Sequence, residues 1–259
     1  MKLSISNLAW NSNDDRKVFS YLREKGFCGV EIAPTKLFGD RPYEHMEEAA
    51  RYFSDMKDDF GLEVSSLQSI WYGREGNIFA SEEERNRLRD YSFSAVDFAS
   101  AIKCGNLVFG NPKARNKSEK NRDDEVFEFF RQISDYAYTH GTCFSLEPNP
   151  VIYNTNFINS TEEAFSFCRV SGCKHLRVNV DLGAVIYNGE TLDCIRENID
   201  MVNHIHISEP YLKKIEKRDI HFALKELDYD RYCSIEMGLQ NSLQDVFDVV
   251  DYICGVFNK

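Results

Sequence analysis

The sequence predicts an α/β fold, a closed eight-stranded parallel (β/α)8 barrel of the TIM-barrel type. The main observation is a set of four short apolar runs in the second half of the chain, separated by helical patterns. These runs cover residues 143–147, 177–181, 202–206 and 232–236. With the strand period of two, each run has one apolar face and one small or polar face. Such strands suit a barrel whose helices cover the apolar faces and whose polar faces turn toward the axis.

Chain length is the second observation. The chain has 259 residues, of which 42% are hydrophobic, and a typical barrel of this kind has about 250 residues. No low-complexity segment, proline-rich linker or change of composition interrupts the sequence. We therefore expect a single domain over residues 1–259.

Alternating strand and helix signals define eight units in order. The expected strands cover residues 3–7, 28–32, 62–68, 106–110, 143–147, 177–181, 202–206 and 232–236. Asn13 is expected to cap the first helix and Gly26 to end it, while Ser81-Glu-Glu-Glu84 has the pattern of a capping box. The expected helices cover residues 14–25, 43–60, 81–103, 123–140, 161–170, 191–200, 219–227 and 242–254.

Charge and cysteine content restrict the class of protein. Forty-two acidic residues against 31 basic ones give a net charge of -11, which opposes binding to nucleic acid or an anionic membrane. Residues 1–10 lack the apolar core of a signal peptide, and no run approaches the roughly 18 apolar residues of a membrane helix. The eight cysteines form no Cys-x-x-Cys pair, which indicates reduced thiols; Cys168 and Cys173 lack the second pair of a zinc knuckle. We expect a soluble cytoplasmic protein, and the sequence leaves monomer and homo-oligomer open.

Each of the four runs contains or ends on a side chain that can bind a metal: Glu147, Asp181, His206 and Glu236. The intervals between them are 34, 25 and 30 residues, close to the roughly 32 residues per unit of an eight-fold barrel. In such barrels the chemistry lies at the C-terminal ends of the strands, so the four side chains are expected to converge.

A bound metal ion explains these four residues better than purely structural roles, such as salt bridges or packing in the core. Taken singly, a glutamate that closes a strand is more often a salt-bridge partner, and a lone histidine more often a core residue. Three crowded carboxylates, however, repel one another unless a cation neutralises them. One imidazole with three carboxylates favours Mn²⁺ or Mg²⁺, with Co²⁺ or Zn²⁺ also possible. Such an ion can take two substrate oxygens and acidify a C–H next to a carbonyl.

Five segments resemble the sugar phosphate isomerase/epimerase family of xylose isomerase-like barrels, over almost the whole chain. They are Leu146-Glu147-Pro-Asn, Val180-Asp181-Leu-Gly, His204-Ile-His206-Ile-Ser-Glu209-Pro, Ser234-Ile-Glu236-Met and Gly26-Phe-Cys-Gly-Val-Glu31-Ile. The resemblance implies that Glu147, Asp181, His206 and Glu236 are the metal ligands. It also implies that Glu147 and Glu236 are the catalytic acid–base pair, on opposite faces of the substrate.

Two departures from the family separate this chain from known branches. Ala184 stands where ketose 3-epimerases of the family carry a substrate-binding histidine, and Tyr153 where they carry a glutamate. Ala184 also replaces one zinc ligand of the DNA-repair endonuclease branch. These differences argue against direct transfer of either specificity.

Further substrate-binding candidates are weaker, and each has a structural alternative. Glu31 and Gln68 end strands, Glu209 and His221 flank the seventh loop, and Trp10 is one of several aromatic residues expected in the loops. Basic clusters at 113–117 and 213–218 follow strands four and seven, and are either solvated loops or anion-binding loops. Arg115 is the preferred anion-binding residue, because a guanidinium can donate two parallel hydrogen bonds.

Together these features predict a metal-dependent isomerase or epimerase of a sugar or sugar derivative, acting by proton transfer next to a carbonyl. The alternatives are a metal-dependent dehydratase similar to dehydroshikimate dehydratase, which would use the same proton abstraction, and a barrel that binds a sugar without turnover.

Overall fold

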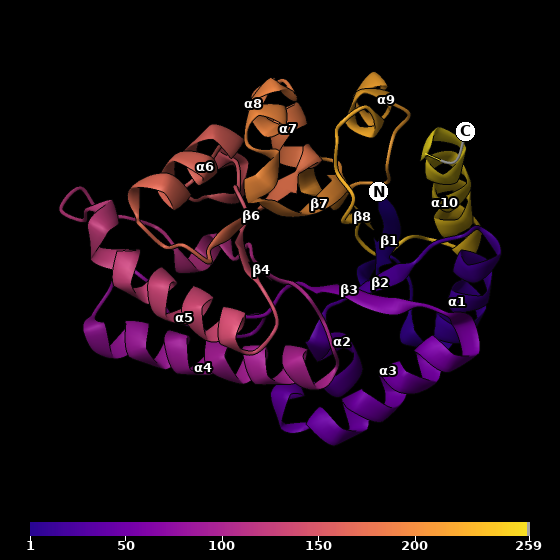
Figure 1. The fold of residues 1–259 in the computed structure, drawn as a ribbon, viewed down its shortest axis with the longest axis horizontal. Helices are drawn as coiled ribbons and strands as arrows, with labels where there is room; N and C mark the ends of the chain where they lie inside the picture. The colour runs from indigo at the N-terminus through magenta and orange to yellow at the C-terminus, as the bar shows by residue number, and fades with distance from the viewer. Residues whose placement is uncertain (258–259) are drawn as a thin grey trace.

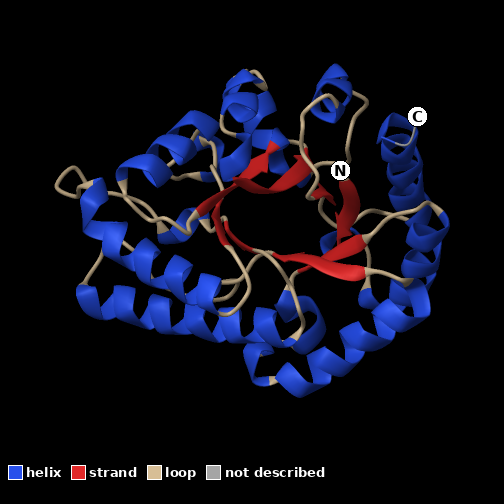
Figure 2. Cartoon of the chain, in the orientation of Figure 1, coloured by secondary structure: helices blue, strands red, loops and turns tan. Residues whose placement is uncertain are grey.

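A computed structural model describes residues 1–257 of the chain and confirms the predicted fold. Eight parallel strands form a closed barrel in chain order, with β8 paired to β1. The strands form a ring inside a layer of helices (Figure 2). The strands are β1 Lys2–Ser6, β2 Gly29–Ile32, β3 Glu63–Leu67, β4 Leu107–Phe109, β5 Phe144–Leu146, β6 Arg177–Asp181, β7 Val202–Ser208 and β8 Tyr232–Glu236.

The helices lie outside the barrel, around its whole circumference (Figure 1). The α-helices are α1 Asp15–Glu24, α2 Pro34–Phe38, α3 Met46–Phe60, α4 Glu82–Ala101, α5 Phe127–Thr139, α6 Thr161–Val170, α7 Leu182–Asn188, α8 Asp193–Glu197, α9 Asp219–Lys225 and α10 Leu243–Phe257. The 3₁₀ turns between these elements include η2 Ser12–Asp14, η3 Pro42–Glu44, η6 Val151–Tyr153, η7 Ile199–Met201 and η8 Pro210–Leu212. The longer helices bury one apolar stripe against the barrel, as α10 does with Val246, Val249 and Val250.

The alternation of side chains along each strand produces two environments. In β7, Ile205 and Ile207 are fully buried in the apolar layer under the helices, while His204 and His206 contact Glu31 of β2. Because β2 and β7 are not neighbours in the barrel, this contact crosses the barrel interior. The polar faces of the strands therefore turn inward, as the sequence predicts.

A hydrogen-bonded network around Asn106 closes the lower part of the interior. Its amide donates to Ser66 Oγ at 3.0 Å, and its carbonyl accepts from Ser145 Oγ at 2.6 Å and Asn203 Nδ2 at 2.8 Å. Asn106 thus joins β3, β5 and β7 through hydrogen bonds between buried side chains.

Two short helices, α2 and α7, are not predicted by the sequence. Each follows directly on the end of a strand and is too short for a helical period to be visible. The helix expected at 191–200 is instead α8, followed by the 3₁₀ turn η7.

Two of the expected caps also differ. Asn13 lies inside η2, and Asp14 precedes α1 without a capping hydrogen bond. Ser81 Oγ accepts from the Glu84 amide at 3.2 Å, as expected, but the Glu84 side chain bonds the Asn77 amide instead of completing a capping box. The contact of Glu84 with Asn77 in the preceding loop therefore replaces the second hydrogen bond of the expected capping box.

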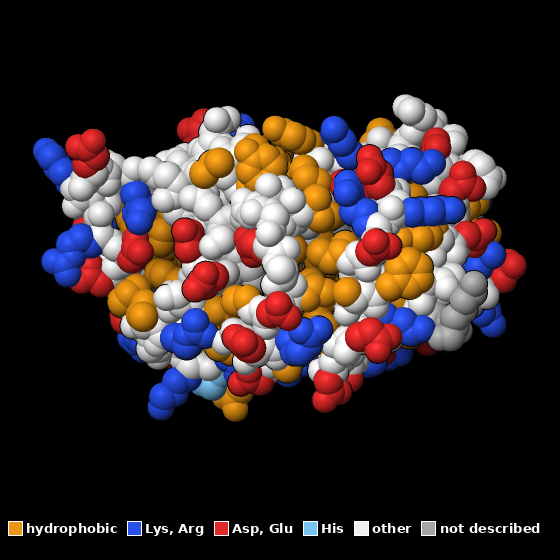
Figure 3. Space-filling model, turned by 90° about the horizontal axis from the view of Figure 1, so that it is seen from above, with side chains coloured by type: hydrophobic (Ala, Val, Ile, Leu, Met, Phe, Trp, Pro, Cys, Tyr) orange, Lys and Arg blue, Asp and Glu red, His pale blue; other side chains and the backbone are white. Residues whose placement is uncertain are grey.

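Within residues 1–257, no helix is both long enough and apolar enough to cross a membrane. All eight cysteines are free thiols. On the face above α8 and α9, acidic and basic side chains are interspersed, without a continuous surface of one sign (Figure 3).

Asn106→Ala should lower the free energy of unfolding by about 2 kcal/mol or more, because the fully buried hydroxyls of Ser66 and Ser145 lose their partner. Urea or thermal unfolding followed by circular dichroism measures this change. The half-exposed Asn86 of α4 is the control, and Asn86→Ala should change stability by no more than about 0.5 kcal/mol. Equal stability of the two variants would contradict a structural role for the network.

Candidate active site

A cavity of about 790 Å³ opens at the C-terminal ends of the strands. Its floor carries the four side chains that the sequence expects to converge, and all four are buried or nearly so. They are Glu147, Asp181, His206 and Glu236. The strands position them because β5 ends one residue before Glu147, β6 and β8 end on Asp181 and Glu236, and β7 passes through His206.

His206 lies at the centre of this group. Its Nδ1 is 2.8 Å from Glu147 Oε1 and 3.2 Å from Glu236 Oε2. One donor atom from each of these three residues lies within 4.8 Å of the others, a spacing at which they could hold one metal ion.

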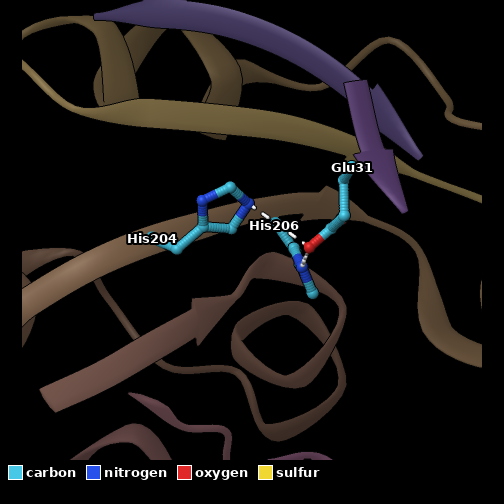
Figure 4. Close-up of side chains that lie close together, drawn as sticks. All are labelled: Glu31, His204 and His206. Carbon is cyan, nitrogen blue, oxygen red and sulfur yellow. Dashed lines mark hydrogen bonds and ion pairs between the residues drawn. The ribbon is translucent and has the colours of Figure 1, made fainter. Parts of the chain in front are cut away.

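The other ring nitrogen of His206 faces away from the cavity. Nε2 lies 3.0 Å from Glu31 Oε1, and His204 Nε2 lies 3.5 Å from the same oxygen (Figure 4). Because Glu31 accepts from Nε2–H, Nδ1 is the ring nitrogen that faces Glu147 and Glu236 and that would bind a cation after losing its proton. Glu31 thus orients the ring behind the site and does not line the cavity.

Asp181 lines the same cavity but is held by its own loop. Its Oδ1 accepts from the Gly183 amide at 2.6 Å, from the Ala184 amide at 3.3 Å and from Ser208 Oγ. The same oxygen caps α7, whose first turn these amides begin. Oδ2 is the atom left for a cation.

The electrostatics of the cluster favour a bound cation. Burial, together with Glu147 and Glu236, raises the pKa of Asp181 to about 7. Burial, together with the nearby carboxylates of Glu147 and Glu31, raises the pKa of Glu236 against the opposing effect of His206. Burial opposes the charging of His206, but Glu236 and Glu31 outweigh it and hold its pKa well above the usual value. Carboxylates held so close in a buried site compete for positive charge, and the residues present therefore fit a divalent ion.

Glu31 and His204 differ in charge. Burial alone would raise the pKa of Glu31, yet His206 and His204 outweigh it and lower the pKa to about 2. Burial lowers the pKa of His204 to about 4, against the pull of Glu31. At neutral pH the pair is a carboxylate beside an uncharged imidazole.

Several residues fix Glu147 that sequence reasoning did not assign to the site. Asn179 Nδ2 donates to Oε1 at 2.8 Å and Asn149 Nδ2 to Oε2 at 3.2 Å. Gly110 leaves room for the carboxylate, since a Cβ there would lie 2.1 Å from Oε2. The strand period places Asn179 on the face of Asp181, and Asn149 belongs to the family-like segment Leu146-Glu147-Pro-Asn, but nothing in the sequence marks Gly110.

The other predicted site residues are dispersed. Gln68 lines the cavity, and its amide donates to Ser6 Oγ. Trp10 is buried outside the cavity lining and donates to Asp15 at 2.7 Å. Glu209 forms a two-point ion pair with Arg218. His221 is buried against the Tyr252 hydroxyl at 2.9 Å. Trp10, Glu209 and His221 are therefore placed outside the lining.

Arg115 is fully buried and also lies outside the lining of the cavity. Its Nη1 donates to the Glu147 carbonyl at 2.8 Å, and its guanidinium lies 5.6 Å from the centre of the Phe109 ring. Burial lowers its pKa to about 10, against the opposing effect of Glu147, so the group stays charged at neutral pH. Its hydrogen bond to the Glu147 carbonyl supports the backbone beneath the site. Within the basic cluster at 113–117, the residues that line the cavity are Lys113 and Ala114.

Tyr153 lines the cavity next to the carboxylates. Its hydroxyl accepts from the Tyr211 amide at 2.8 Å, which joins the loop after β5 to the loop after β7. Burial, with smaller effects of Asp181, Glu236 and Glu147, raises the pKa of Tyr153 to about 12. The phenol therefore keeps its proton and can donate it into the cavity.

Fold and site define a parallel β/α barrel with a carboxylate–histidine cluster at the C-terminal ends of its strands. The family model of the xylose isomerase-like TIM barrel matches residues 19–251. The chain belongs to this family.

Known proteins with similar sequences or structures include sugar epimerases. The 3-dehydro-D-guloside 4-epimerase of Escherichia coli (strain K12) is 23% identical over 244 residues, which cover 90% of this chain and 89% of that protein. The apo structure of 3-keto-D-glucoside 4-epimerase from E. coli has a TM-score of 0.78 at 20% identity, with 98% of both chains covered. The D-psicose 3-epimerase of Clostridium cellulolyticum H10, in structures with D-tagatose, has a TM-score of 0.78 at 14% identity, with 99% of both chains covered. At these identities the structural likeness shows the shared fold.

Gly110→Ala should displace the Glu147 carboxylate, because the new Cβ would overlap Oε2. We expect the variant to fold with a near-native melting temperature and to bind Mn²⁺ at least about tenfold more weakly, measured by isothermal titration calorimetry. Gly105→Ala is the matched control, since a Cβ there meets no atom within 4 Å. Unchanged Mn²⁺ affinity in Gly110→Ala would mean that the position of Glu147 does not matter for the ion.

Proposed function

We propose that this protein is a divalent-metal-dependent epimerase or isomerase of a sugar or sugar derivative. The observation that carries the proposal is the placement of Glu147 and Glu236 on either side of one metal-capable imidazole nitrogen, at the floor of a cavity large enough for a sugar. Similarity to sugar epimerases supports the substrate class.

Glu147, Asp181, His206 and Glu236 are the residues that would hold the ion, with Mn²⁺ or Mg²⁺ favoured by the oxygen-rich donor set. When bound, the ion would hold the carbonyl and neighbouring hydroxyl oxygens of the substrate and stabilise the negative charge that proton removal creates.

Glu147 and Glu236 are the proposed acid–base pair. One carboxylate removes the proton from the carbon next to the carbonyl, and the C–H electron pair moves into a carbon–carbon double bond as the carbonyl oxygen becomes negative. The other carboxylic acid returns a proton to the opposite face, so the configuration of the carbon inverts. Because β5 and β8 are three strands apart around the barrel, the two groups reach the substrate from different sides.

The chain also supplies orientation around this pair. Asn179 and Asn149 hold the Glu147 carboxylate, and Glu31 fixes the ring of His206. The Tyr153 hydroxyl is placed to donate to a substrate oxygen. Trp71 and Phe109 give the cavity an apolar wall that limits the access of water to the reacting carbon.

The test is a panel of keto sugars incubated with Mn²⁺-loaded protein in D₂O and followed by NMR. Deuterium incorporation next to the carbonyl, with appearance of an epimer or isomer, is the expected result. An alkene product would instead support the dehydratase, and binding without exchange would support a non-catalytic sugar-binding barrel.

Glu147→Gln and Glu236→Gln should each lower turnover and solvent exchange by roughly 10²–10⁴-fold, because an amide cannot take up the proton. Metal content is measured in parallel, since both residues are also proposed ligands. Glu83→Gln is the control, on an α4 side chain that is 84% exposed. Turnover and exchange that survive both changes would exclude this acid–base pair.

His206→Ala and Glu236→Ala should lose stoichiometric metal while staying folded, because each removes a donor from the centre of the cluster. The measurement is metal analysis by mass spectrometry after loading with Mn²⁺ and gel filtration, with circular dichroism as the check on folding. His45→Ala, on an exposed histidine outside the barrel, should keep the metal. Normal metal content in both site variants would refute the ligand assignment.

A further inference from the structure

Two cations, Arg74 and Lys113, line the cavity together with the three carboxylates, and Glu75 lies at its rim beside Arg74. Glu147, Asp181 and Glu236 come from β5, β6 and β8, whereas the cations Arg74 and Lys113 come from the loops after β3 and β4. In a closed ring of eight strands, β3 lies opposite β7 and β4 lies opposite β8. The loop after β3 therefore faces β7 and His206 across the cavity, whereas the loop after β4 lies beside Glu147.

Arg74 is a half-buried guanidinium without a carboxylate partner among the described residues. Its Nη2 donates to the Asp40 carbonyl, and the group lies 4.7 Å from the centre of the Tyr91 ring. Its Nε is buried and has no hydrogen-bond partner. The remaining N–H groups of a guanidinium in this position are free to donate to an anion.

A second cavity of about 350 Å³ lies on the other side of Arg74, between η3 and α4. Tyr91 contributes a buried hydroxyl whose proton has no acceptor among the described side chains. Glu44 also lines this cavity, but it pairs with Arg41 at 3.3 Å. Glu75, at the rim of the main cavity, is exposed and forms none of the ion pairs found in residues 1–257. The Arg74 guanidinium and the Tyr91 hydroxyl thus interact at the boundary of the two cavities, and neither is paired with a carboxylate among the described residues.

We infer that Arg74 and Tyr91 form a subsite for a carboxylate or phosphate group. Guanidinium and phenol donors suit such a group, because charge-assisted hydrogen bonds to it are short and directional. The inference rests on the proposed function in one respect: the anionic group belongs to the sugar substrate, whose keto end lies at the carboxylate cluster. A sugar whose keto end lies at the carboxylate cluster and whose anionic group lies at Arg74 binds in the cavity in one orientation.

Arg74 differs from Arg115 in this respect. Arg115 also has unpartnered nitrogens, Nε and Nη2, but it is fully buried and outside the lining of the cavity. Arg74 lines both cavities, so a ligand can reach it.

The first experiment is a calorimetric titration of the full-length protein with inorganic phosphate. Phosphate should bind to the wild type, and Arg74→Gln should weaken binding at least about tenfold, because the variant loses the charged hydrogen-bond donor. Tyr91→Phe keeps the ring under the guanidinium, so it tests the hydroxyl even if Arg74→Gln loosens the loop. Arg87→Gln is the control, on an exposed arginine of α4 paired with Glu83. No phosphate binding to the wild type, or equal weakening in all three variants, would overturn the subsite.

The second experiment identifies the source of the anion. Mn²⁺-loaded wild type and Arg74→Gln are titrated with D-fructose and with D-fructose 6-phosphate. Tighter binding of the phosphorylated ketose, lost in Arg74→Gln, is the expected result. Equal affinity of the wild type for both sugars, with phosphate still bound at Arg74, would overturn the assignment to the substrate and indicate a free anion as ligand. Binding of phosphate with neither sugar bound would count against the proposed function and leave the subsite supported.

Discussion

The contact of His206 with acidic side chains on both of its nitrogens is the interaction on which the rest of the site depends. Glu147 and Glu236 face Nδ1, and Glu31 faces Nε2 from across the barrel. With Asp181 in the same cavity, four carboxylates, none more than 8% exposed, share one imidazole. A single imidazolium cannot neutralise four carboxylates, and the raised pKa of Asp181 expresses that excess. A divalent ion at this cluster would supply the missing charge.

The barrel can hold such a cluster because the outward and inward faces of its strands have different roles. The outward faces of the strands pack against helices and supply the apolar burial that stabilises the fold. The inward faces are then free to carry small and polar groups, provided that these groups find partners. Asn106 supplies partners in the lower part of the barrel, and Asn179 supplies them beside Glu147. Gly110 adds a steric condition, since any side chain there would occupy the space of the carboxylate.

The fold and the convergence of the four central residues could be predicted because both follow from regular periods. The period of two along 177–181 and 202–206 defines which side chains point inward. The four residues recur about once per strand–helix unit, so each lies near the end of a strand, and these ends meet at one end of the barrel. Those rules concern strands and say nothing about loops. Arg115 and Arg74 illustrate the limit: both follow strands and both are arginines, yet one supports a backbone carbonyl in the interior and the other faces two cavities. Glu31 illustrates a second limit of sequence-based prediction. Its contact with His206 crosses the barrel from β2 to β7, and the sequence around Glu31 does not indicate which distant side chain it reaches.

Backbone strain is distributed unevenly between the two ends of the barrel. In residues 1–257, the non-glycine residues with positive φ are Ser69, Lys103, Asn154, Ile158, Tyr211 and Leu212. All of these except Lys103 lie in loops that follow β3, β5 or β7, at the end where the cavity opens.

At the other end, the positions after α1, α3 and α5 have positive φ as well, but glycine occupies them: Gly26, Gly61 and Gly141. Glycine adopts this conformation without cost, whereas a side chain at the same φ costs free energy that the surrounding contacts must offset. A non-glycine residue with positive φ that contacts the cavity therefore indicates a role for its side chain in shaping the cavity. The strained turn at Tyr211 and Leu212 places the Tyr211 amide on the Tyr153 hydroxyl and Leu212 on the cavity wall. The loops after β5 and β7 are thereby fixed relative to one another beside the cavity, so this part of its wall is held in shape before a substrate arrives.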